Sequence, residues 1–366
     1  MEAEREIGGI ALSFAAGTAA AALTGDFILS NSLIFSLLPL TVIASGMITL
    51  MHPSHRGWNR LKTMIVIAAV MTAAGLVCWL SDSLMSVSRT GTLPGRAAQA
   101  GGQFLISAIE SVPFENKDTN ALVAALIAGD RSDIPLQITE AFRSSGASHI
   151  LALSGLHLGI IYAIIRRCLS PIGNSPAAGR VKALLTVIFC GAYTLCTGAG
   201  ASIVRAFLFI LLYETARLTG RSASTASVLF SALLIQLVTD PGSIESVGFQ
   251  LSYAAMAGIA FIFPRLKNLW KGDGRKSPMR WIWDSAAMSI ACQITTGPLV
   301  YHYFGTFPQY FLLTNMIALP LAGMIIPAAL AVTLLTVLGI CPGILTRATE
   351  MLITALTEAL DIIASM

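Results

Sequence analysis

Residues 285–346, 62 in succession, contain no Asp, Glu, Lys or Arg. A helix needs about 20 apolar residues to cross a bilayer, so this run is long enough for two or three crossings. In the whole chain only 11% of residues are charged and 55% are hydrophobic, whereas a soluble domain carries about 25% charged residues. The sequence therefore predicts an all-α, polytopic integral membrane protein and excludes a soluble globule.

Shorter apolar stretches raise the expected number of transmembrane or re-entrant helices to about ten or eleven. Those before the long run span residues 7–25, 27–51, 63–81, 147–165, 183–198, 202–218, 222–239 and 246–264. We expect an N-terminal three-helix transmembrane region at 1–85, extracytoplasmic amphipathic helices at 86–146 and a transmembrane core at 147–366. Five prolines in and around the long run, at 298, 308, 320, 327 and 342, predict broken or re-entrant helices beside a cavity.

The distribution of basic residues predicts the orientation of the chain. Of the 23 Lys and Arg, 15 lie in loops that a single orientation places in the cytoplasm, among them residues 52–62 and 265–280. The turns TGAGAS and TDPGSIES, which that orientation places outside, contain none. We therefore expect a cytoplasmic N-terminus. Its leader EAERE is acidic, whereas a signal peptide starts with basic residues, so we expect the first helix to be retained.

Two segments have the pattern of amphipathic helices. Between residues 86 and 146 charges of both signs return, and apolar residues recur at helical spacing. We expect interfacial helices here, one capped by Asp118 or Thr119 and the last ended by Gly146. The tail, residues 350–365, also has one apolar and one polar face, which predicts an interfacial or cavity-lining helix.

The sequence predicts no metal centre, no cofactor and no disulfide. Its six cysteines form no CxxC pair, and most lie in apolar runs where cysteine packs as a small apolar side chain. The five histidines, at 52, 55, 149, 157 and 302, form no cluster with the spacing of metal ligands.

Three stretches follow one another in an order that is similar to a known family. They are ALIAGDRSDIPLQITEAFRSSGASHILALSGLHLG at residues 125–159, GAGASIVRAF at 198–207 and DPGSIESVGFQLSY at 240–253. This part of the chain resembles the membrane domain of the ComEC competence family, bacterial channels that bring single-stranded DNA across the inner membrane. The resemblance begins at residue 119 and extends to the region of residue 330.

The resemblance implies that residues 147–366 form a competence-type channel core in the bacterial inner membrane, with single-stranded DNA as substrate. It also implies a separate DNA receptor, nuclease and cytoplasmic translocation motor as partners. Family members usually carry an oligonucleotide-binding fold and a metallo-β-lactamase-like domain. Residues 81–120 are too short and too helical for the first, and the histidines form no HxHxDH cluster for the second. We therefore expect a channel domain that lacks both modules and is not an enzyme.

Ser154 and His157 are polar residues within the apolar run 147–165, and their spacing places them on one face of a helix. The resemblance implies that both side chains project into a hydrated lumen. Alternatively, they hydrogen-bond to neighbouring helices, with Gly155 and Gly159 as a GxxxG motif that permits close packing.

Arg205 lies a few positions inside the expected span 202–218. An arginine near the bilayer centre costs at least about 2.5 to 3.5 kcal/mol, so a compensating interaction is required. A guanidinium group matches a phosphate in bidentate fashion, and we expect Arg205 to line the path and attract a polyanion. Snorkelling to the outer interface is the alternative. Ser202, one turn earlier, is expected to cap the helix or to orient the Arg205 side chain.

Uncharged polar residues in the later spans complete the expected lining of the path. They are Gln250, Ser252, Gln293 and Asn315. A wet, neutral lining lets a polyanion slide, because conduction requires weak and repeated binding. Hydrogen bonds between helices would explain any single member of the set. The aromatic residues between 301 and 311 either stack on bases or form an interfacial belt.

Two other functions stay open. A narrow cavity that is closed in mid-membrane would favour a small-solute transporter on the same scaffold. An intramembrane serine hydrolase would use Ser154 as nucleophile and a histidine as base. The three-residue spacing seldom aims the imidazole of His157 at that hydroxyl, and no oxyanion site is evident.

Overall fold

The computed structural model describes residues 2–23, 60–85, 93–173, 175–220, 224–270, 278–340 and 343–366, together with isolated positions 39, 42 and 43. This described part contains helices and turns and no strand. The all-α membrane class is therefore confirmed, while the number of spans stays a prediction. The expected span at 27–51 and the basic loop that follows it fall almost entirely outside the described residues.

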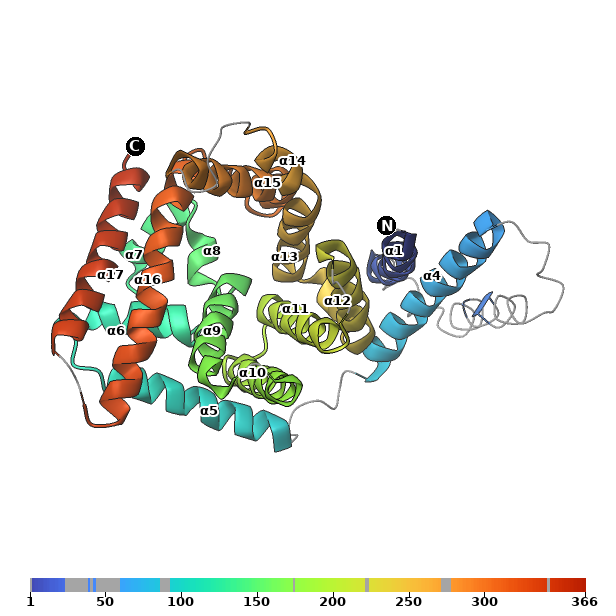
Figure 1. The fold of residues 1–366 in the computed structure, drawn as a ribbon. Coiled ribbons are helices and arrows are strands. Elements are labelled where there is room, and N and C mark those ends of the chain that lie inside the picture. The colour runs from blue at the N-terminus through green and yellow to red at the C-terminus, as the bar shows by residue number, and fades with distance from the viewer. Residues whose placement is uncertain are drawn as a thin grey trace.

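Fifteen α-helices carry the labels of Figure 1. They are α1 Glu2–Leu23, α4 Arg60–Met85, α5 Leu93–Glu110, α6 Lys117–Ile127, α7 Leu136–Ser144, α8 Ser148–Leu151, α9 Gly155–Cys168, α10 Pro176–Cys196, α11 Ala201–Leu218, α12 Thr225–Thr239, α13 Val247–Ala257, α14 Phe263–Lys267, α15 Pro278–Phe304, α16 Phe311–Val337 and α17 Gly343–Ala364. A π-helical turn at Gly258–Ile262 joins α13 to α14, and short 3-10 turns lie at Ser170–Ile172 and Pro241–Glu245.

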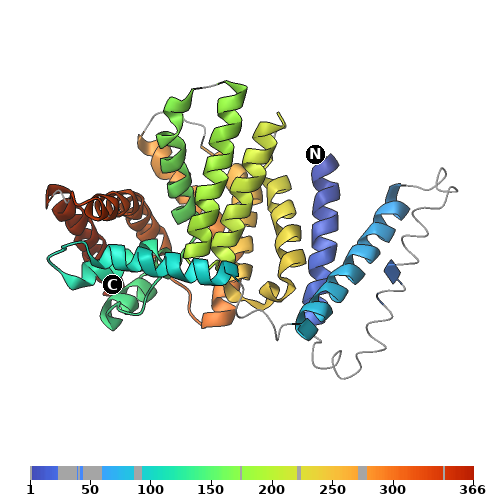
Figure 2. The ribbon, with the colours of Figure 1, turned by 90° about the horizontal axis from the view of Figure 1, so that it is seen from below.

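The helices form a ring with an arm attached to it. Figure 2 shows α1, α10, α11 and α12 side by side with roughly parallel axes, and Figure 1 looks along these axes. In Figure 1, α8, α9, α11, α13 and α15 surround a central space, while α5, α16 and α17 lie across the direction of α10. The arm consists of α1 and α4, and α1 packs against α12. The ring thus places the starts of α9, α11 and α13 at one end of the bundle.

Within the described residues, four helical segments are long and apolar enough to cross a membrane, namely α1 from Glu4, α10, the continuous α13–α14 and α16. The outer side of α10 shows what surrounds the protein. Leu184, Ile188 and Leu195 are exposed there, whereas the opposite side of the helix buries Thr186 and Thr194. Both threonine hydroxyls donate to the carbonyl four residues earlier in the helix. Large apolar residues outside and small polar residues inside indicate a lipid environment.

The segment expected to lie on the membrane surface is partly a core element. Leu122, Val123, Leu126 and Ile127 of α6 are buried in the largest apolar cluster, together with residues of α16 and α17. The N-cap of α6 is Asn116, whose side chain accepts from the Asp118 backbone N–H, so the expected caps at Asp118 and Thr119 are wrong. Gly146 does follow the end of α7, with a φ of 81° that favours glycine.

Helix continuity differs from expectation at two places. The expected single helix at 147–165 is divided into α8 and α9, because Ser154 has an extended backbone, with φ −125° and ψ 173°. Conversely, α15 continues through Pro298, and α16 continues through Pro320 and Pro327. The break within residues 147–165 is thus made by the cap of α9. Pro298, Pro320 and Pro327 sit inside intact helices.

The apolar face expected in the tail is present in α17. Ile353, Leu356, Leu360 and Ile363 are buried, and most of them belong to the same cluster as α6. The tail therefore packs against the ring with the face that its sequence pattern indicated.

Candidate functional site

Arg205 lies at the start of α11, between α9 and α13. A Cβ added to Gly155 of α9 would lie 3.4 Å from its Nη2 atom, and its Cζ is 5.9 Å from the centroid of the Tyr253 ring on α13. Only 6% of Arg205 is exposed, and its Nη1 atom is buried without a hydrogen-bond partner. The cation is thus held inside the bundle, in contrast to a snorkelling arginine, whose charged head extends outward.

Tyr253 belongs to a chain of hydrogen bonds between three helices. Its hydroxyl donates to Oε1 of Gln236 on α12 over 3.0 Å, and Nε2 of Gln236 donates to the carbonyl oxygen of Ala201 at the start of α11. The ring of Phe249 packs against that of Tyr253. This chain fixes the aromatic ring that faces the Arg205 guanidinium, and a cation over such a ring is stabilised electrostatically.

Ser154 and His157 form a capping box at the start of α9. The Leu156 N–H donates to Oγ of Ser154 over 3.3 Å, and the Ser154 N–H donates to Nδ1 of His157 over 3.2 Å. The Ser154 hydroxyl also lies 3.1 Å from Nδ1. Because Nδ1 accepts the backbone N–H, the imidazole proton belongs on Nε2, which is buried without a partner. Ser154 and His157 are therefore close in space, but they meet at a helix cap and not along one helix face.

The GxxxG interpretation applies to one of its two glycines. Gly155 contacts α11, where Arg205 and Ala206 lie within 4 Å of a Cβ built on it. Gly159 has no heavy atom within 4 Å of such a Cβ, so no helix approaches it closely. A continuous close helix contact across both glycines is absent here.

Ser202 and Gln250 connect neighbouring helices at the same end of the bundle. Ser202 does not cap α11, because the N-cap is Gly200, and its hydroxyl instead lies 3.4 Å from the Gly248 carbonyl oxygen. Gln250 accepts a 2.7 Å hydrogen bond from the hydroxyl of Tyr303 on α15 and donates to the Ile244 carbonyl. Ser252, on α13, is buried.

Gln293 and Asn315 lie away from Arg205, in two separate pockets. Gln293 of α15 lines a pocket of about 560 Å³ with Tyr301, Phe307 and Phe311. Asn315 of α16 lines another of about 390 Å³. The Gln293 Nε2 and Asn315 Oδ1 atoms are buried without hydrogen bonds. The structure therefore gathers six of the eight predicted residues at one end of the bundle and places these two elsewhere.

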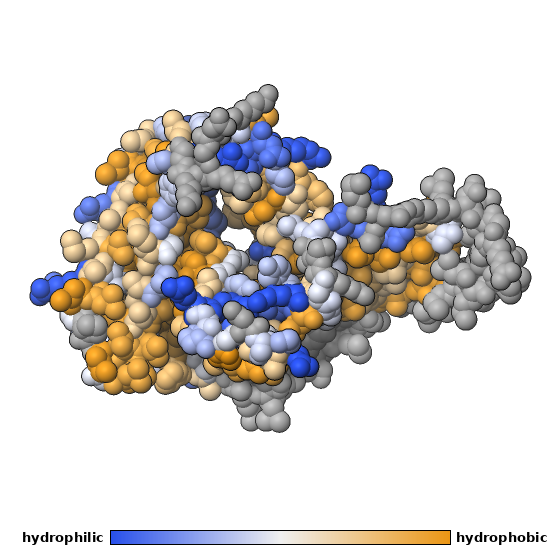
Figure 3. Space-filling view, in the orientation of Figure 1, coloured by the Kyte–Doolittle hydropathy of each residue, from blue (hydrophilic) through white to orange (hydrophobic). Residues whose placement is uncertain are grey.

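The space-filling view in Figure 3 shows an opening through the ring, at the place that α8, α9, α11, α13 and α15 surround in Figure 1. It is seen along the direction of α1 and α10, so it runs parallel to these helices. The residues near its edge range from hydrophilic to hydrophobic. The helices that carry Arg205 and its neighbours thus border this opening.

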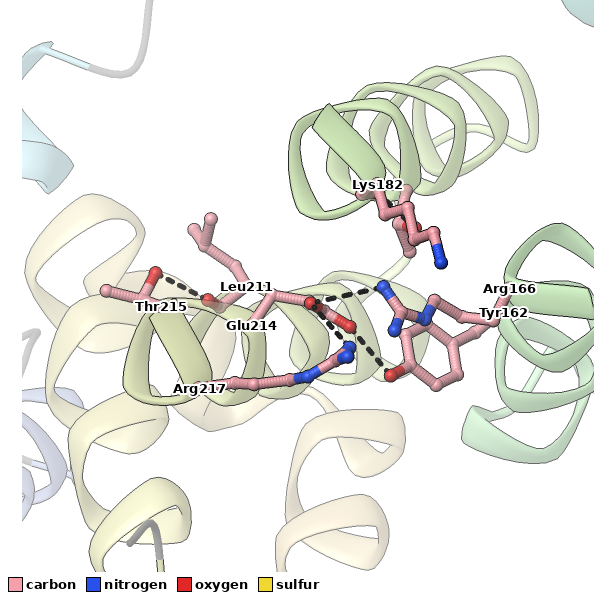
Figure 4. A network of polar contacts seen from close by, with 8 residues as sticks. Tyr162, Arg166, Lys182, Leu211, Glu214, Thr215 and Arg217 are labelled. Carbon is pink, nitrogen blue, oxygen red and sulfur yellow. Dashed lines mark hydrogen bonds and ion pairs between the residues drawn. The ribbon is translucent and has the colours of Figure 1, made fainter. Parts of the chain in front are cut away.

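A second polar cluster, which the sequence analysis did not single out as a site, joins the opposite ends of α9, α10 and α11 (Figure 4). Glu214 is only 1% exposed. It accepts a 2.7 Å hydrogen bond from the hydroxyl of Tyr162, and its Oε2 lies 3.7 Å from Nη1 of Arg166 and 3.6 Å from Nη1 of Arg217. The available signal was that Glu214 is the only acidic residue in the span 202–218.

The described residues contain no group of three or more His, Cys, Asp or Glu that could hold a metal ion.

A family model described as "Competence protein" matches residues 126–366, which include all eight predicted site residues. The chain belongs to the competence protein family. The match extends the resemblance seen in residues 119–330 to the end of the chain and confirms the predicted family.

Curated relatives named ComE operon protein 3 and competence protein ComA align with more than half of the chain. The competence-family chain is 28% identical over 223 residues to ComE operon protein 3 of Bacillus subtilis, which is 60% of this chain and 27% of that relative. It is 26% identical over 210 residues to competence protein ComA of Neisseria gonorrhoeae, which is 56% of this chain and 28% of that relative. The aligned part therefore spans less than a third of either relative. No solved structure matches the chain.

Proposed function

We propose that this competence-family chain forms a path for single-stranded DNA across the bacterial inner membrane during natural transformation. Family membership supports a role in DNA uptake. The structural observation that supports a path is the buried Arg205, which lies between two helices that border the opening in Figure 3.

The chemistry of this end of the bundle suits a polyanion. Arg205 supplies one fixed positive charge, and an arginine inside a membrane domain attracts phosphate groups from water. Around it, Ser154, Ser202 and Gln250 present neutral hydroxyl and amide groups from three helices. A single cation among neutral polar groups binds a phosphate weakly, and weak binding allows a strand to move on.

In this proposal the chain itself is not an enzyme and requires no cofactor. A separate receptor delivers DNA, a separate nuclease degrades the other strand, and a cytoplasmic motor pulls the strand. The N-terminus lies in the cytoplasm, because that orientation places the basic loops there as well. Arg205 and its neighbours then lie at the outer end of the bundle, and the Glu214 cluster lies at the cytoplasmic end.

Uptake of labelled DNA by cells tests the proposal. Cells that carry Arg205→Ala or His157→Ala at the wild-type protein level should internalise much less label and bind as much label at the surface. Arg143→Ala is the matched control, because Arg143 is exposed on α7 and its loss should leave uptake unchanged. Undiminished uptake with both Arg205→Ala and His157→Ala would remove the two residues from the path. Undiminished uptake without the gene would contradict the proposed function.

A serine hydrolase is the second candidate, and the 3.1 Å distance between Ser154 Oγ and His157 Nδ1 favours it. Two observations weigh against it. Nδ1 is shared with the Ser154 backbone N–H, and Nε2 has no partner that would orient the imidazole. A capping box accounts for the same contact without catalysis.

A further inference from the structure

Positive charge exceeds negative charge where α9, α10 and α11 meet. Arg166 and Arg217 both lie against the single carboxylate of Glu214, and Lys182 lies on the far side of Arg166 (Figure 4). Their formal charges sum to plus two, and the carboxylate is buried. Burying like charges together without an anion is costly, and such groups inside a membrane domain are commonly functional.

The existing contacts leave two of these cations incompletely paired. Lys182 is 6% exposed, and its Nζ has a long hydrogen bond of 3.4 Å to the neutral carbonyl of Ser170. No ion pair of Lys182 occurs among the described residues. Arg166 Nη1 is buried and makes no hydrogen bond, because its 3.7 Å separation from Glu214 exceeds hydrogen-bond length.

Glu214 cannot satisfy all of these donors. A guanidinium carries five N–H donors and an ammonium carries three, whereas a carboxylate offers two oxygens. One of these oxygens already accepts from Tyr162. In Figure 4 the ammonium of Lys182 points from α10 toward the side of Arg166 that faces away from Arg217. Arg217 is half exposed and its charge is solvated by water, so the charges that are largely withdrawn from water are those of Arg166 and Lys182.

We propose that Arg166 and Lys182 bind a phosphodiester group of the DNA strand as it leaves the passage, and that Glu214 is a positioning residue that holds Arg166. This inference rests on the proposed function. A phosphodiester has two non-bridging oxygens and one negative charge, which suits a guanidinium on one side and an ammonium on the other.

The position of the cluster favours a strand over a lipid headgroup. Arg205 and Glu214 are nine residues apart on α11, which is about 14 Å along the helix axis. α9 and α11, which carry Arg166 and Glu214, border the opening, and α10, which carries Lys182, packs against both of them. The Glu214 side chain is only 2% exposed, so the centre of the cluster faces the bundle interior and not the lipid.

Two matched pairs of substitutions test the inference. Lys182→Gln is compared with Arg180→Gln on α10, and Arg166→Gln with Arg167→Gln on α9. Each pair removes one buried or partly buried charge and one exposed charge from the same helix. The full chain is purified in detergent, and binding of a fluorescein-labelled oligothymidylate is followed by anisotropy as a function of salt concentration.

Lys182→Gln and Arg166→Gln should each weaken binding about tenfold and lower the slope of log affinity against log salt by roughly 0.7, the value for one phosphate contact on a single strand. Arg180→Gln and Arg167→Gln should change the affinity less than twofold. Lys182→Arg keeps the charge and should retain most of the affinity. The two helices give independent tests, so the result stands if one buried variant fails to accumulate.

Three results would overturn the inference. Equal losses of oligothymidylate affinity for the two variants of each pair would show that binding depends only on the total positive charge at this end of the bundle. Unchanged affinity in both buried variants would remove the cluster from the binding path. Loss of thermal stabilisation by phosphatidylglycerol, with unchanged oligothymidylate affinity, would assign the cluster to lipid headgroups. Absence of oligothymidylate binding by the wild-type chain would instead contradict the proposed function itself.

Discussion

Tyr162 on α9 donates a 2.7 Å hydrogen bond to Oε1 of Glu214 on α11, and this bond links two helices of the ring at the end opposite Arg205 (Figure 4). Both side chains sit between helices, where a hydrogen bond to a charged acceptor contributes more than one in water. The pair therefore fixes how α9 and α11 lie against each other.

Replacing Tyr162 with Phe removes this hydrogen bond and keeps the ring. The free energy of unfolding should fall by about 1.5 to 3 kcal/mol, the usual contribution of a hydrogen bond to a charged group. A thermal melt of the purified chain measures the loss. Tyr213→Phe is the control, because Tyr213 is exposed on the neighbouring turn of α11 and should have little effect. Equal melting temperatures for Tyr162→Phe and wild type would mean that the bond does not stabilise the fold.

Replacing Glu214 with Gln should lower the free energy of unfolding less than replacing it with Ala. Glu214→Gln keeps an oxygen for the Tyr162 hydroxyl, whereas Glu214→Ala leaves Arg166 largely buried without an anion. Removing one partner of a buried ion pair costs about 3 to 5 kcal/mol, and we expect the alanine variant to approach this range. Thermal melts rank the two variants. In addition, Glu214→Gln should bind oligothymidylate less tightly than wild type, because the ion pair that positions Arg166 is lost. Tighter binding by a folded Glu214→Gln would show that Glu214 competes with the phosphate and does not position Arg166.

The crossing of α1 and α4 depends on two glycines. A Cβ on Gly17 would overlap the backbone carbonyl of Thr72, and a Cβ on Gly75 would overlap that of Phe14. Gly17→Ala and Gly75→Ala must therefore push the helices apart, and we expect each to destabilise the arm by about 1 to 3 kcal/mol. Gly9→Ala is the matched control on α1, since the nearest atom to its Cβ is the flexible end of Met64 at 3.9 Å. A thermal melt in which all three variants behave alike would contradict this crossing.

The ring of Tyr253 and its hydroxyl have separable roles. Tyr253→Phe keeps the aromatic face for Arg205 and loses the 3.0 Å hydrogen bond to Gln236, at a cost of about 1 kcal/mol. Tyr253→Leu also loses the cation–π contact, which contributes about 2 kcal/mol when desolvated. DNA uptake should thus remain near the wild-type level with Phe and drop with Leu at equal protein level. Equal uptake with Phe and Leu would show that the ring does not position Arg205.

Much of the architecture could be predicted because the bilayer imposes simple rules on the sequence. The length of apolar runs identified the helices that became α1, α10 and α11, and the 3.6-residue period identified the apolar face of α17. These rules fail where contacts with neighbouring helices determine whether a helix is buried. The pattern of α6 is amphipathic, but α16 and α17 cover it, so it is buried.

The candidate site was predictable in residue type more than in geometry. A lone arginine in an apolar span is easily recognised as a candidate site residue, because burial of its charge requires a compensating interaction. The structure encloses Arg205 between helices, with 6% of the residue exposed. The division of residues 147–165 was less visible, since the capping role of Ser154 depends on an extended backbone that apolar periodicity does not reveal. Glu214 was overlooked because an acidic residue three positions before Arg217 resembles an ordinary pair at a helix end. Glu214 contacts Tyr162 and Arg166 of α9, which are far from it in the sequence, so no local sequence pattern indicates these contacts.

Substitution of Ser154 separates the capping role from the catalytic one. Ser154→Asn keeps a side-chain oxygen that accepts from the first turn of α9, and asparagine caps helices as well as serine does. Ser154→Ala removes the cap and should cost about 1 kcal/mol. If Ser154 acts as a cap, Ser154→Asn should retain wild-type melting temperature and DNA uptake, and Ser154→Ala should lower the melting temperature modestly. If Ser154 is a nucleophile, asparagine cannot replace its hydroxyl, and both variants should lose activity alike while Ser154→Asn remains folded. That second pattern would favour the hydrolase over the DNA path, because a conduction path needs only a polar group at this position, whereas hydrolysis needs the hydroxyl itself.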